Sequence, residues 1–164
     1  MRALILSFLL ATQAVAESPQ ATTATYGNWT LGCEMRGEVQ ACQIVTRLNV
    51  KGQDGQLRPL LALALLSGEG GRALRLELPP GVDLRAAARL DGSGVEGQDP
   101  LAVFTYLTCG PGLCLAETLA SDDLVAQMVK AEAMDISFTL FEGGKVARVP
   151  VSLIGFGDAV SGLK

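Results

Sequence analysis

The sequence predicts an all-β protein, a single antiparallel β-sandwich or barrel-like domain with one short helix. Apolar and polar side chains alternate through most of the chain, which is the two-residue period of strands with one buried face. Turn residues interrupt this alternation roughly every 8 to 12 positions, a spacing typical of antiparallel sandwiches and barrels. The 164 residues are enough for one hydrophobic core, and neither an internal repeat nor a domain linker is visible. We therefore expect residues 26–164 to form one β-rich domain.

Strands are expected from the start of this domain. Residues 26–35 and 40–50 alternate, and a turn at residues 36–38 joins them into a hairpin. Residues 60–66 are apolar without interruption, which predicts a central strand buried on both faces. Residues 74–78 alternate again and end at a Pro-Pro-Gly turn.

The second half of the chain continues this pattern. Residues 84–90 alternate, although their alanines also permit a helix. Residues 101–108 form an apolar strand that ends at Cys109. The last two predicted strands, residues 136–140 and 146–153, are joined by a Gly-Gly hairpin turn.

One helix is expected, at about residues 121–131. Ser121 is a good N-cap, because its hydroxyl can accept a hydrogen bond from a free backbone N–H of the first turn. Asp122 and Asp123 suit the positive N-terminal end of a helix, and Lys130 suits its negative C-terminal end. Capping therefore explains the two adjacent carboxylates better than a catalytic pair does.

The amino terminus has the features of a secretory signal peptide. Arg2 provides a short positive region, an apolar run follows, and Ala14-Val15-Ala16 is the small-x-small pattern that signal peptidase accepts. We expect residues 1–16 to be removed before Glu17. The apolar run is shorter than the ~20 residues of a membrane span, so we expect no transmembrane segment in the mature form. Residues 17–25 are polar and are expected to form a disordered tail.

Composition excludes several classes of function. The chain has 13 Lys and Arg against 17 Asp and Glu, a net charge of −4, and loss of Arg2 makes the mature chain more negative still. No cluster of Lys or Arg appears in the sequence, which disfavours binding to nucleic acid or to anionic lipid by charge. Histidine is absent, which excludes Ser-His and Cys-His nucleophile pairs and most zinc and copper sites. We expect no cofactor.

Four cysteines follow the signal peptide, an even number that predicts disulfides formed in an oxidising compartment. Three connectivities are possible. The pairs Cys33–Cys42 and Cys109–Cys114 are favoured, because each spacing suits closure of a short strand-turn-strand unit. The four residues between Cys109 and Cys114 do not match the C-x-x-C spacing of thioredoxin-like enzymes, which favours a structural role.

The best candidate for an ion site is a glycine-rich acidic loop that contains Asp91, Glu96 and Asp99. Three carboxylates on such a loop could surround Ca²⁺, a hard cation that takes several oxygen ligands. The spacing matches no EF-hand loop, however, and a solvated turn is the simpler interpretation. Trp29 and Tyr26 could form an aromatic platform for a ligand, but the alternation of Trp29 with Leu31 favours a core position.

Five short motifs span nearly the whole mature chain. They are Trp29-Thr-Leu-Gly-Cys33, Cys42-Gln-Ile44, Leu78-Pro-Pro-Gly-Val82, Cys109-x4-Cys114-Leu-Ala116 and Pro150-Val-Ser-Leu-Ile-Gly-Phe156. Together and in this order they resemble the invasion-associated locus B proteins of the Gram-negative envelope. The chain departs from that pattern at Leu113, where the family has a glycine directly before the second cysteine.

The resemblance implies a β-rich protein of the periplasm or cell surface, linked in some pathogens to host-cell entry, with no established catalytic residues. We therefore expect an exported, non-enzymatic protein that is periplasmic, secreted or surface-associated and binds a protein or cell-surface partner. Two alternatives stay open. One is a glycan-directed hydrolase that uses paired carboxylates, and the other is a purely structural component of the envelope.

Overall fold

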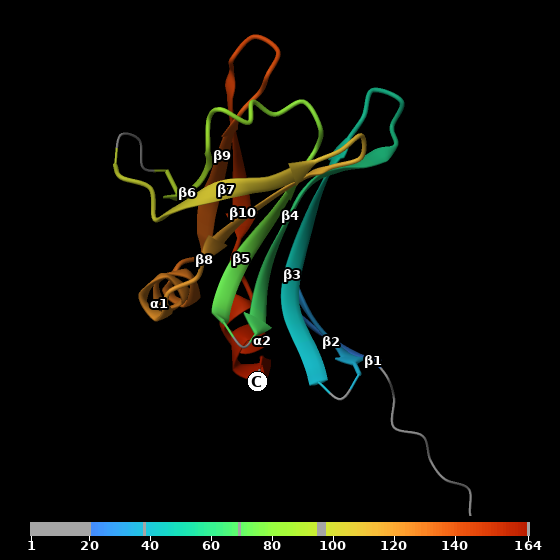
Figure 1. Cartoon of the computed structure of the whole chain (residues 1–164), viewed down its shortest axis with the longest axis vertical. Helices are drawn as coiled ribbons and strands as arrows, with labels where there is room; N and C mark the ends of the chain where they lie inside the picture. Colours follow the sequence, from blue (N-terminus) through green and yellow to red (C-terminus); the bar gives the residue numbers. More distant parts are fainter. Residues whose placement is uncertain (1–20, 38, 69, 95–97, 164) are drawn as a thin grey trace, which may run out of the picture.

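One antiparallel sheet of ten strands curls into a half-barrel (Figure 1). The structure is a computed structural model and describes residues 21–37, 39–68, 70–94 and 98–163. The strands follow the order β1-β2-β3-β4-β5-β8-β7-β6-β9-β10, and every neighbouring pair is antiparallel. The all-β fold class and the barrel-like architecture predicted from the sequence are confirmed.

The strands are β1 (Ala21–Tyr26), β2 (Trp29–Arg36), β3 (Val39–Lys51), β4 (Leu57–Gly68), β5 (Gly71–Leu78), β6 (Ala88–Gly92), β7 (Ala102–Cys109), β8 (Cys114–Leu119), β9 (Ala133–Thr139) and β10 (Val146–Ser152). The helices found within the described residues are α1 (Asp122–Lys130) and α2 (Phe156–Gly162). Both helices lie at the same end of the half-barrel (Figure 1).

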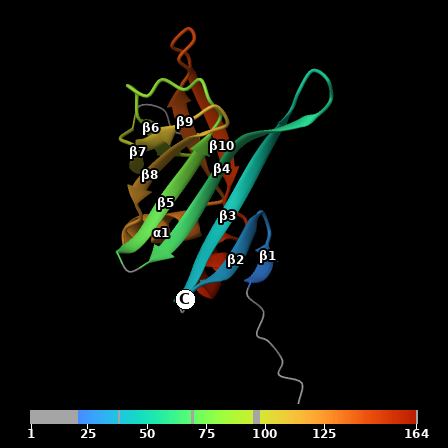
Figure 2. The same ribbon diagram turned by 45° about the vertical axis from the view of Figure 1, so that its right-hand side comes forward.

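The sheet changes direction at β7, which pairs with two different strands. Residues 102–104 pair with β6, whereas residues 105–109 pair with β8. Strand β6 pairs in turn with β9, and β9 with β10. As a result, β6, β9 and β10 lie behind the long strands β3, β4 and β5, as Figure 2 shows.

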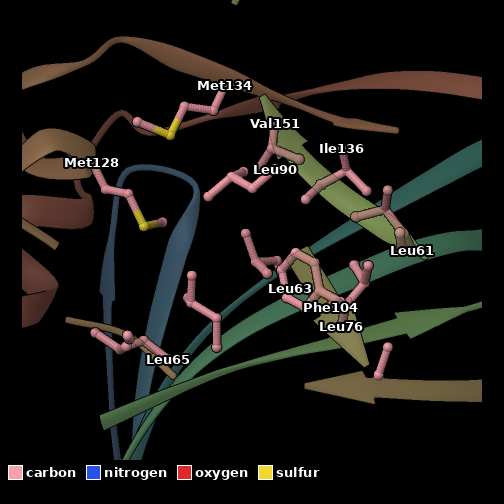
Figure 3. Close-up of a cluster of buried hydrophobic side chains, with 14 of the residues drawn as sticks. Leu61, Leu63, Leu65, Leu76, Leu90, Phe104, Met128, Met134, Ile136 and Val151 are labelled. Atoms are coloured by element: carbon pink, nitrogen blue, oxygen red, sulfur yellow. The ribbon is translucent and has the colours of Figure 1, made fainter. Parts of the chain in front are cut away.

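The core lies between these two parts of the sheet (Figure 3). Its side chains come from both parts and are almost fully buried; they include Leu63, Leu65, Leu76, Leu90, Phe104, Ile136 and Val151. Met128 of α1 joins them. Burial of one such side chain contributes roughly 1.5–3 kcal/mol, so this core is the main source of stability.

The two ends of the sheet meet at one place, which we call the closure: residues 26–29 and 152–156. The backbone N–H of Asn28 donates to the carbonyl of Ile154 at 3.0 Å, and the indole N–H of Trp29 donates to the carbonyl of Ser152, also at 3.0 Å. The rings of Trp29 and Phe156 pack edge to face with centroids 4.8 Å apart, and both side chains are fully buried. The closure thus joins β2 to the segment after β10 without a ladder of strand pairing.

Two glycines permit this close approach. Gly27 has a φ of +54° and Gly155 a φ of +87°, both in the left-handed region that favours glycine. A Cβ on Gly155 would overlap the carbonyl of Tyr26, and a Cβ on Gly27 would overlap the carbonyl of Ile154. Any other residue at either position would push the two segments apart.

Several predicted elements are present. Residues 61–65 of β4 are all buried, which confirms the central strand. Helix α1 begins after Ser121, whose Oγ accepts a hydrogen bond from the N–H of Leu124 at 3.1 Å. Cys33 lies directly opposite Cys42 across the β2–β3 hairpin, as the spacing predicted.

The predicted strand at residues 84–90 was wrong in its first half, since β6 begins at Ala88. Residues 83–86 form a turn instead, closed by a hydrogen bond from the N–H of Ala86 to the carbonyl of Asp83 at 3.1 Å. The side chain of Asp83 also accepts the backbone N–H of Arg85 at 3.0 Å. Local hydrogen bonds of this kind compete with strand pairing, and alternation of side chains alone does not reveal them.

Two further expectations need correction. Residues 17–25 were expected to be disordered, yet residues 21–25 belong to β1, which pairs in regular register with β2. Their threonines favour strands, and pairing decides the outcome. Helix α2 was not predicted at all, because its glycines lower helix propensity; burial of Phe156 and Ala159 overrides that preference. Residues 1–20, which include the predicted signal peptide, lie outside the described residues.

Candidate functional site

Strands β6, β9 and β10 have an apolar inner face and a polar outer face. Leu90 of β6 and Ile136 of β9 lie opposite each other and point into the core (Figure 3). Because successive side chains of a strand point to opposite faces, the residues on either side of them point away from the core. These outward positions hold charged and hydroxyl side chains.

The outward side chains form two rows across the three strands. In one row, Ser137 of β9 lies between Arg89 of β6 and Arg148 of β10. In the next row, Asp135 of β9 lies directly opposite Asp91 of β6. We call these five residues the polar cluster.

Asp91 is only 6% exposed, and both of its carboxylate oxygens are engaged. The hydroxyl of Ser137 donates to Oδ2 at 2.6 Å, and Nη2 of Arg89 lies 3.3 Å from Oδ1. Ser137 is itself 5% exposed. A buried carboxylate is costly unless it is paired and hydrogen-bonded, and here both conditions are met.

Asp135, also 6% exposed, forms the second half of the cluster. Its Oδ2 accepts the backbone N–H of Gly94 at 3.3 Å and lies 3.7 Å from Nη1 of Arg148. Arg89 also donates to the carbonyl of Gln98, at 3.5 Å. The cluster thereby ties the segments on both sides of the β6–β7 loop to the sheet.

A groove of about 530 Å³ opens over this cluster. We call it the outer groove. Its floor and walls include four members of the cluster together with residues of the β6–β7 loop and of β9 and β10: Arg89, Asp91, Ser137, Arg148, Gln98, Asp99, Thr139 and Val146. Asp91 is a buried member of this lining, whereas the side chains of Arg89 and Arg148 are 44% and 37% exposed.

Of the three residues considered as calcium ligands, the structure brings two to this groove. Asp91 and Asp99 both line it, whereas Glu96 lies outside the described residues. Asp91 already binds Ser137 and Arg89, and the described part of the chain contains no group of three His, Cys, Asp or Glu residues arranged to hold a metal ion. The calcium hypothesis stays a prediction.

Sequence reasoning missed the rest of the cluster: Arg89, Asp135, Ser137 and Arg148. The available signal was that polar residues alternate with apolar ones in each of these strands. That pattern is typical of a solvent-facing strand, and it does not show that a loop covers the polar face. Only the register of β6, β9 and β10 shows which of these polar residues are neighbours.

The end of the half-barrel opposite the helices carries the second candidate surface. The β3–β4 and β9–β10 hairpins and residues 79–87 lie there in both views (Figures 1 and 2). We call it the loop end, and the exposed apolar side chains on it and on the neighbouring β7–β8 hairpin include Val50, Leu57, Leu84, Leu113, Leu140 and Phe141. Leu57 and Phe141 are 71% and 68% exposed. A hollow of about 330 Å³ lies beside them, with Leu48, Leu60, Pro79, Pro80 and Leu113 in its lining.

Charge at the loop end is paired locally. Arg85 donates two side-chain hydrogen bonds to Asp83, at 2.9 Å each, which lowers the pKa of Asp83 to about 2 and raises the pKa of Arg85. The guanidinium of Arg85 also lies 6.0 Å from the centroid of the Phe141 ring. Burial, reinforced by the charge of Asp83, raises the pKa of Tyr106.

Both predicted disulfides are present. Cys33–Cys42 links β2 to β3, and Cys109–Cys114 closes the β7–β8 hairpin. Each joins residues that lie directly opposite each other in the strand register. On the loop-entropy model each bridge adds roughly 2–3 kcal/mol to the free energy of unfolding.

The remaining candidates have structural roles. Trp29 is fully buried in the closure, as its alternation with Leu31 predicted, and is not a surface platform. Asp122 stands at the first turn of α1 and forms an ion pair with Arg72 of β5. This contact supports capping and docking of the helix as the role of that carboxylate.

A family model described as invasion associated locus B (IalB) protein matches residues 29–164. The chain belongs to this family. It is similar to the invasion protein B homolog of Brucella abortus (strain 2308), with 28% identity over 137 residues, 83% of this chain and 75% of that protein. Its fold matches the crystal structure of invasion associated protein B from Bartonella henselae with a TM-score of 0.71. That match has 21% identity and covers 87% of this chain and 94% of the other.

None of the helices in the described residues is long and apolar enough to cross a membrane.

Proposed function

We propose that this IalB-family protein is exported to the envelope and binds a protein or cell-surface partner through its loop end, without catalysing a reaction. The observation that carries this proposal is the group of exposed apolar side chains on that end. Single apolar residues on a surface need no explanation, but several gathered on neighbouring hairpins are typical of binding surfaces. Export and partner binding also agree with the resemblance to invasion proteins, which are named for a process rather than a reaction.

The loop end is held in shape before any partner arrives. The N–H of Phe141 donates to the carbonyl of Gly81 at 2.8 Å, which fixes the β9–β10 hairpin to residues 79–87. The Cys109–Cys114 disulfide fixes the neighbouring β7–β8 hairpin. Less conformational entropy is lost on binding when the contact residues are already ordered, so such a surface supports recognition.

The hydrolase alternative has one observation in its favour, since Asp91 lines a groove and lies directly opposite Asp135 on the neighbouring strand. Both oxygens of Asp91 are engaged by Ser137 and Arg89, however, which leaves neither free to protonate a leaving group. A binding role therefore accounts for the arrangement better than general acid catalysis does.

The binding proposal is tested by replacing the two most exposed apolar side chains of the loop end. A double variant, Leu57→Ser and Phe141→Ser, should fold normally and fail to restore whatever envelope or host-cell phenotype a deletion strain shows. Leu119→Ser is the matched control, because Leu119 is 79% exposed but lies at the far end of β8 from the loop end. Full activity of the double variant, with thermal unfolding unchanged, would contradict the proposal.

Export has its own test. The intact mass of protein from the envelope fraction should correspond to a chain that begins at Glu17. A mass that retains residues 1–16 in that fraction would contradict cleavage of the predicted signal peptide.

A further inference from the structure

We propose that the outer groove is a binding site for an uncharged oligosaccharide, independent of the function proposed for the loop end, with which it shares only Ala86 and Ala87 of residues 79–87. The proposal starts from where charge is buried. Asp91, Asp135 and Ser137 are each 6% exposed or less, although they lie on the outer face of the sheet. Well-packed apolar side chains would hold the β6–β7 loop there as firmly as buried ion pairs do, and often more so. A groove lined by such fixed polar groups is therefore a candidate binding site.

The groove is lined by strong hydrogen-bond donors. The guanidinium groups of Arg89 and Arg148 belong to its lining, are partly exposed, and lie 3.3 Å from Asp91 and 3.7 Å from Asp135. A guanidinium carries five N–H donors in a rigid plane, and one ion-pair contact leaves most of them free. A ligand in the groove would thus meet donors and must offer oxygen acceptors.

The charge of the groove selects among oxygen-rich ligands. Arg89 and Arg148 are balanced by Asp91 and Asp135, and Asp99 adds a further negative charge to the lining. A phosphate or carboxylate would find no excess of positive charge, because each guanidinium already has its own counter-ion. A cation would have to displace an arginine and leave a buried carboxylate without its partner, which is costly. An uncharged ligand avoids both penalties.

Saccharide hydroxyls fit these requirements because each one can accept and donate. They can accept from Arg89 and Arg148 on the floor and donate to the carboxylate of Asp99 at the rim, with the hydroxyl of Thr139 also in the lining. The volume of about 530 Å³ lies within the roughly 300–1,000 Å³ typical of small-ligand sites, and its polar lining suits a polar ligand. These features together point to a short chain of neutral sugars.

The test is a titration of the ¹⁵N-labelled mature protein with three neutral trisaccharides, namely N,N′,N″-triacetylchitotriose, cellotriose and maltotriose, followed by NMR. We expect at least one to give saturable shifts of the backbone amides of residues 89, 98–99, 137 and 148. Sodium phosphate, titrated at constant ionic strength, should not give them. Absence of saturable shifts with all three sugars, or saturation by phosphate instead, would overturn the proposal.

Variants distinguish a role of these residues in sugar binding from a purely structural role. Arg148→Ala should weaken the sugar affinity at least tenfold, whereas Arg85→Ala should leave it unchanged. Arg85 is a matched control, because its guanidinium is also paired with an aspartate, Asp83, but lies outside the groove lining. If Arg148→Ala does not fold, Asp99→Asn serves in its place, because Asp99 is an exposed member of the lining. Unchanged affinity in a folded groove variant would also overturn the proposal.

The two proposals fail independently. The loop-end double variant should bind the sugar as the wild type does, because none of its changes touches the outer groove. A protein that loses its phenotype through the loop end but binds no sugar would refute only the groove proposal.

Discussion

The closure and the polar cluster both bury polar atoms, but they do so in opposite ways. In the closure the polar contacts are a backbone hydrogen bond and one from the indole N–H of Trp29, and the side chains of Trp29 and Phe156 are fully buried. In the polar cluster the buried atoms are carboxylates, and arginines that reach into a groove compensate them. The first region leaves no space even for a Cβ, whereas the second lies beneath about 530 Å³ of open volume.

This difference shows which region serves the fold and which is open to a ligand. Packing without voids and neutral hydrogen bonds contribute to stability directly. Buried ion pairs contribute little on balance, because desolvation offsets their attraction, although removal of one partner is costly. The closure should therefore control the stability of the half-barrel, while the polar cluster should affect stability moderately and ligand binding strongly.

The largest effect is expected from Gly155→Ala. The substitution adds roughly 1–3 kcal/mol of backbone strain at a φ of +87° and a similar cost for the overlap of its Cβ with the carbonyl of Tyr26. Chemical denaturation should show a loss of roughly 2–6 kcal/mol. Gly144→Ala is the control, because Gly144 has a φ of +60° but nothing within reach of a Cβ. It should cost only about 1–2 kcal/mol, and equal losses for the two variants would refute the tight closure.

Trp29→Phe should have the next largest effect. It removes the indole N–H that the fully buried Trp29 donates to the partly buried carbonyl of Ser152. The lost hydrogen bond and the lost side-chain volume together predict a loss of roughly 2–4 kcal/mol. Urea unfolding measures it. A loss below about 1 kcal/mol would mean that packing against Phe156, and not the hydrogen bond, holds the closure.

A substitution in the polar cluster should lower the free energy of unfolding less than one in the closure does. Ser137→Ala removes the hydroxyl that donates to Asp91 at 2.6 Å but keeps the ion pair with Arg89. Hydrogen bonds to charged groups are worth about 1.5–3 kcal/mol, and we expect a loss near the lower limit because Arg89 remains. The same variant should lower sugar affinity if the groove binds one. A loss larger than that of Gly155→Ala would reverse the comparison between the two regions.

Much of the fold could be predicted from the sequence because local patterns encode it. Strand β4 is apolar throughout residues 61–65 and is buried on both faces, and Ser121 marks the start of α1. Strand β1 and helix α2 could not be predicted, since both depend on distant contacts. The threonines of β1 need β2 as a partner, and the glycine-containing α2 needs its contact with β1 and β2.

The candidate site was less accessible to sequence reasoning. Cys33–Cys42 and Cys109–Cys114 are close in sequence, so their spacing predicted their pairing. Asp91 was noticed only for the acidic loop that follows it. Its actual partner, Ser137, is 46 residues away and becomes a neighbour only through the pairing of β6 with β9. Alternation alone suggests that such residues face solvent, because the contacts that Gly94 and Gln98 make with the cluster leave no mark in the alternation of the strands.

The smallest effect concerns an ion pair at the surface, and it tests whether burial or geometry makes Asp91–Arg89 special. Asp83 and Arg85 are joined by shorter contacts than Asp91 and Arg89, yet the side chain of Arg85 is 81% exposed. The hydrogen bonds from Arg85 lower the pKa of Asp83 from 3.8 to about 2. The folded protein therefore binds fewer protons at this site than the unfolded chain does between pH 4 and 2. This contribution to stability is complete above pH 4 and is lost as the pH falls through about 2.

Asp83→Asn should remove that part of the pH dependence and little else. Denaturation curves of wild type and variant should converge as the pH falls from 4 to 2 and stay parallel above pH 5. Arg85→Gln should remove the same portion, and the double variant should add nothing further, because both changes delete one interaction. If the difference in the free energy of unfolding between wild type and Asp83→Asn stays constant from pH 4 to 2, the ion pair does not lower the pKa of Asp83. In that case short contacts at the surface would not contribute to stability, and burial alone would distinguish the polar cluster.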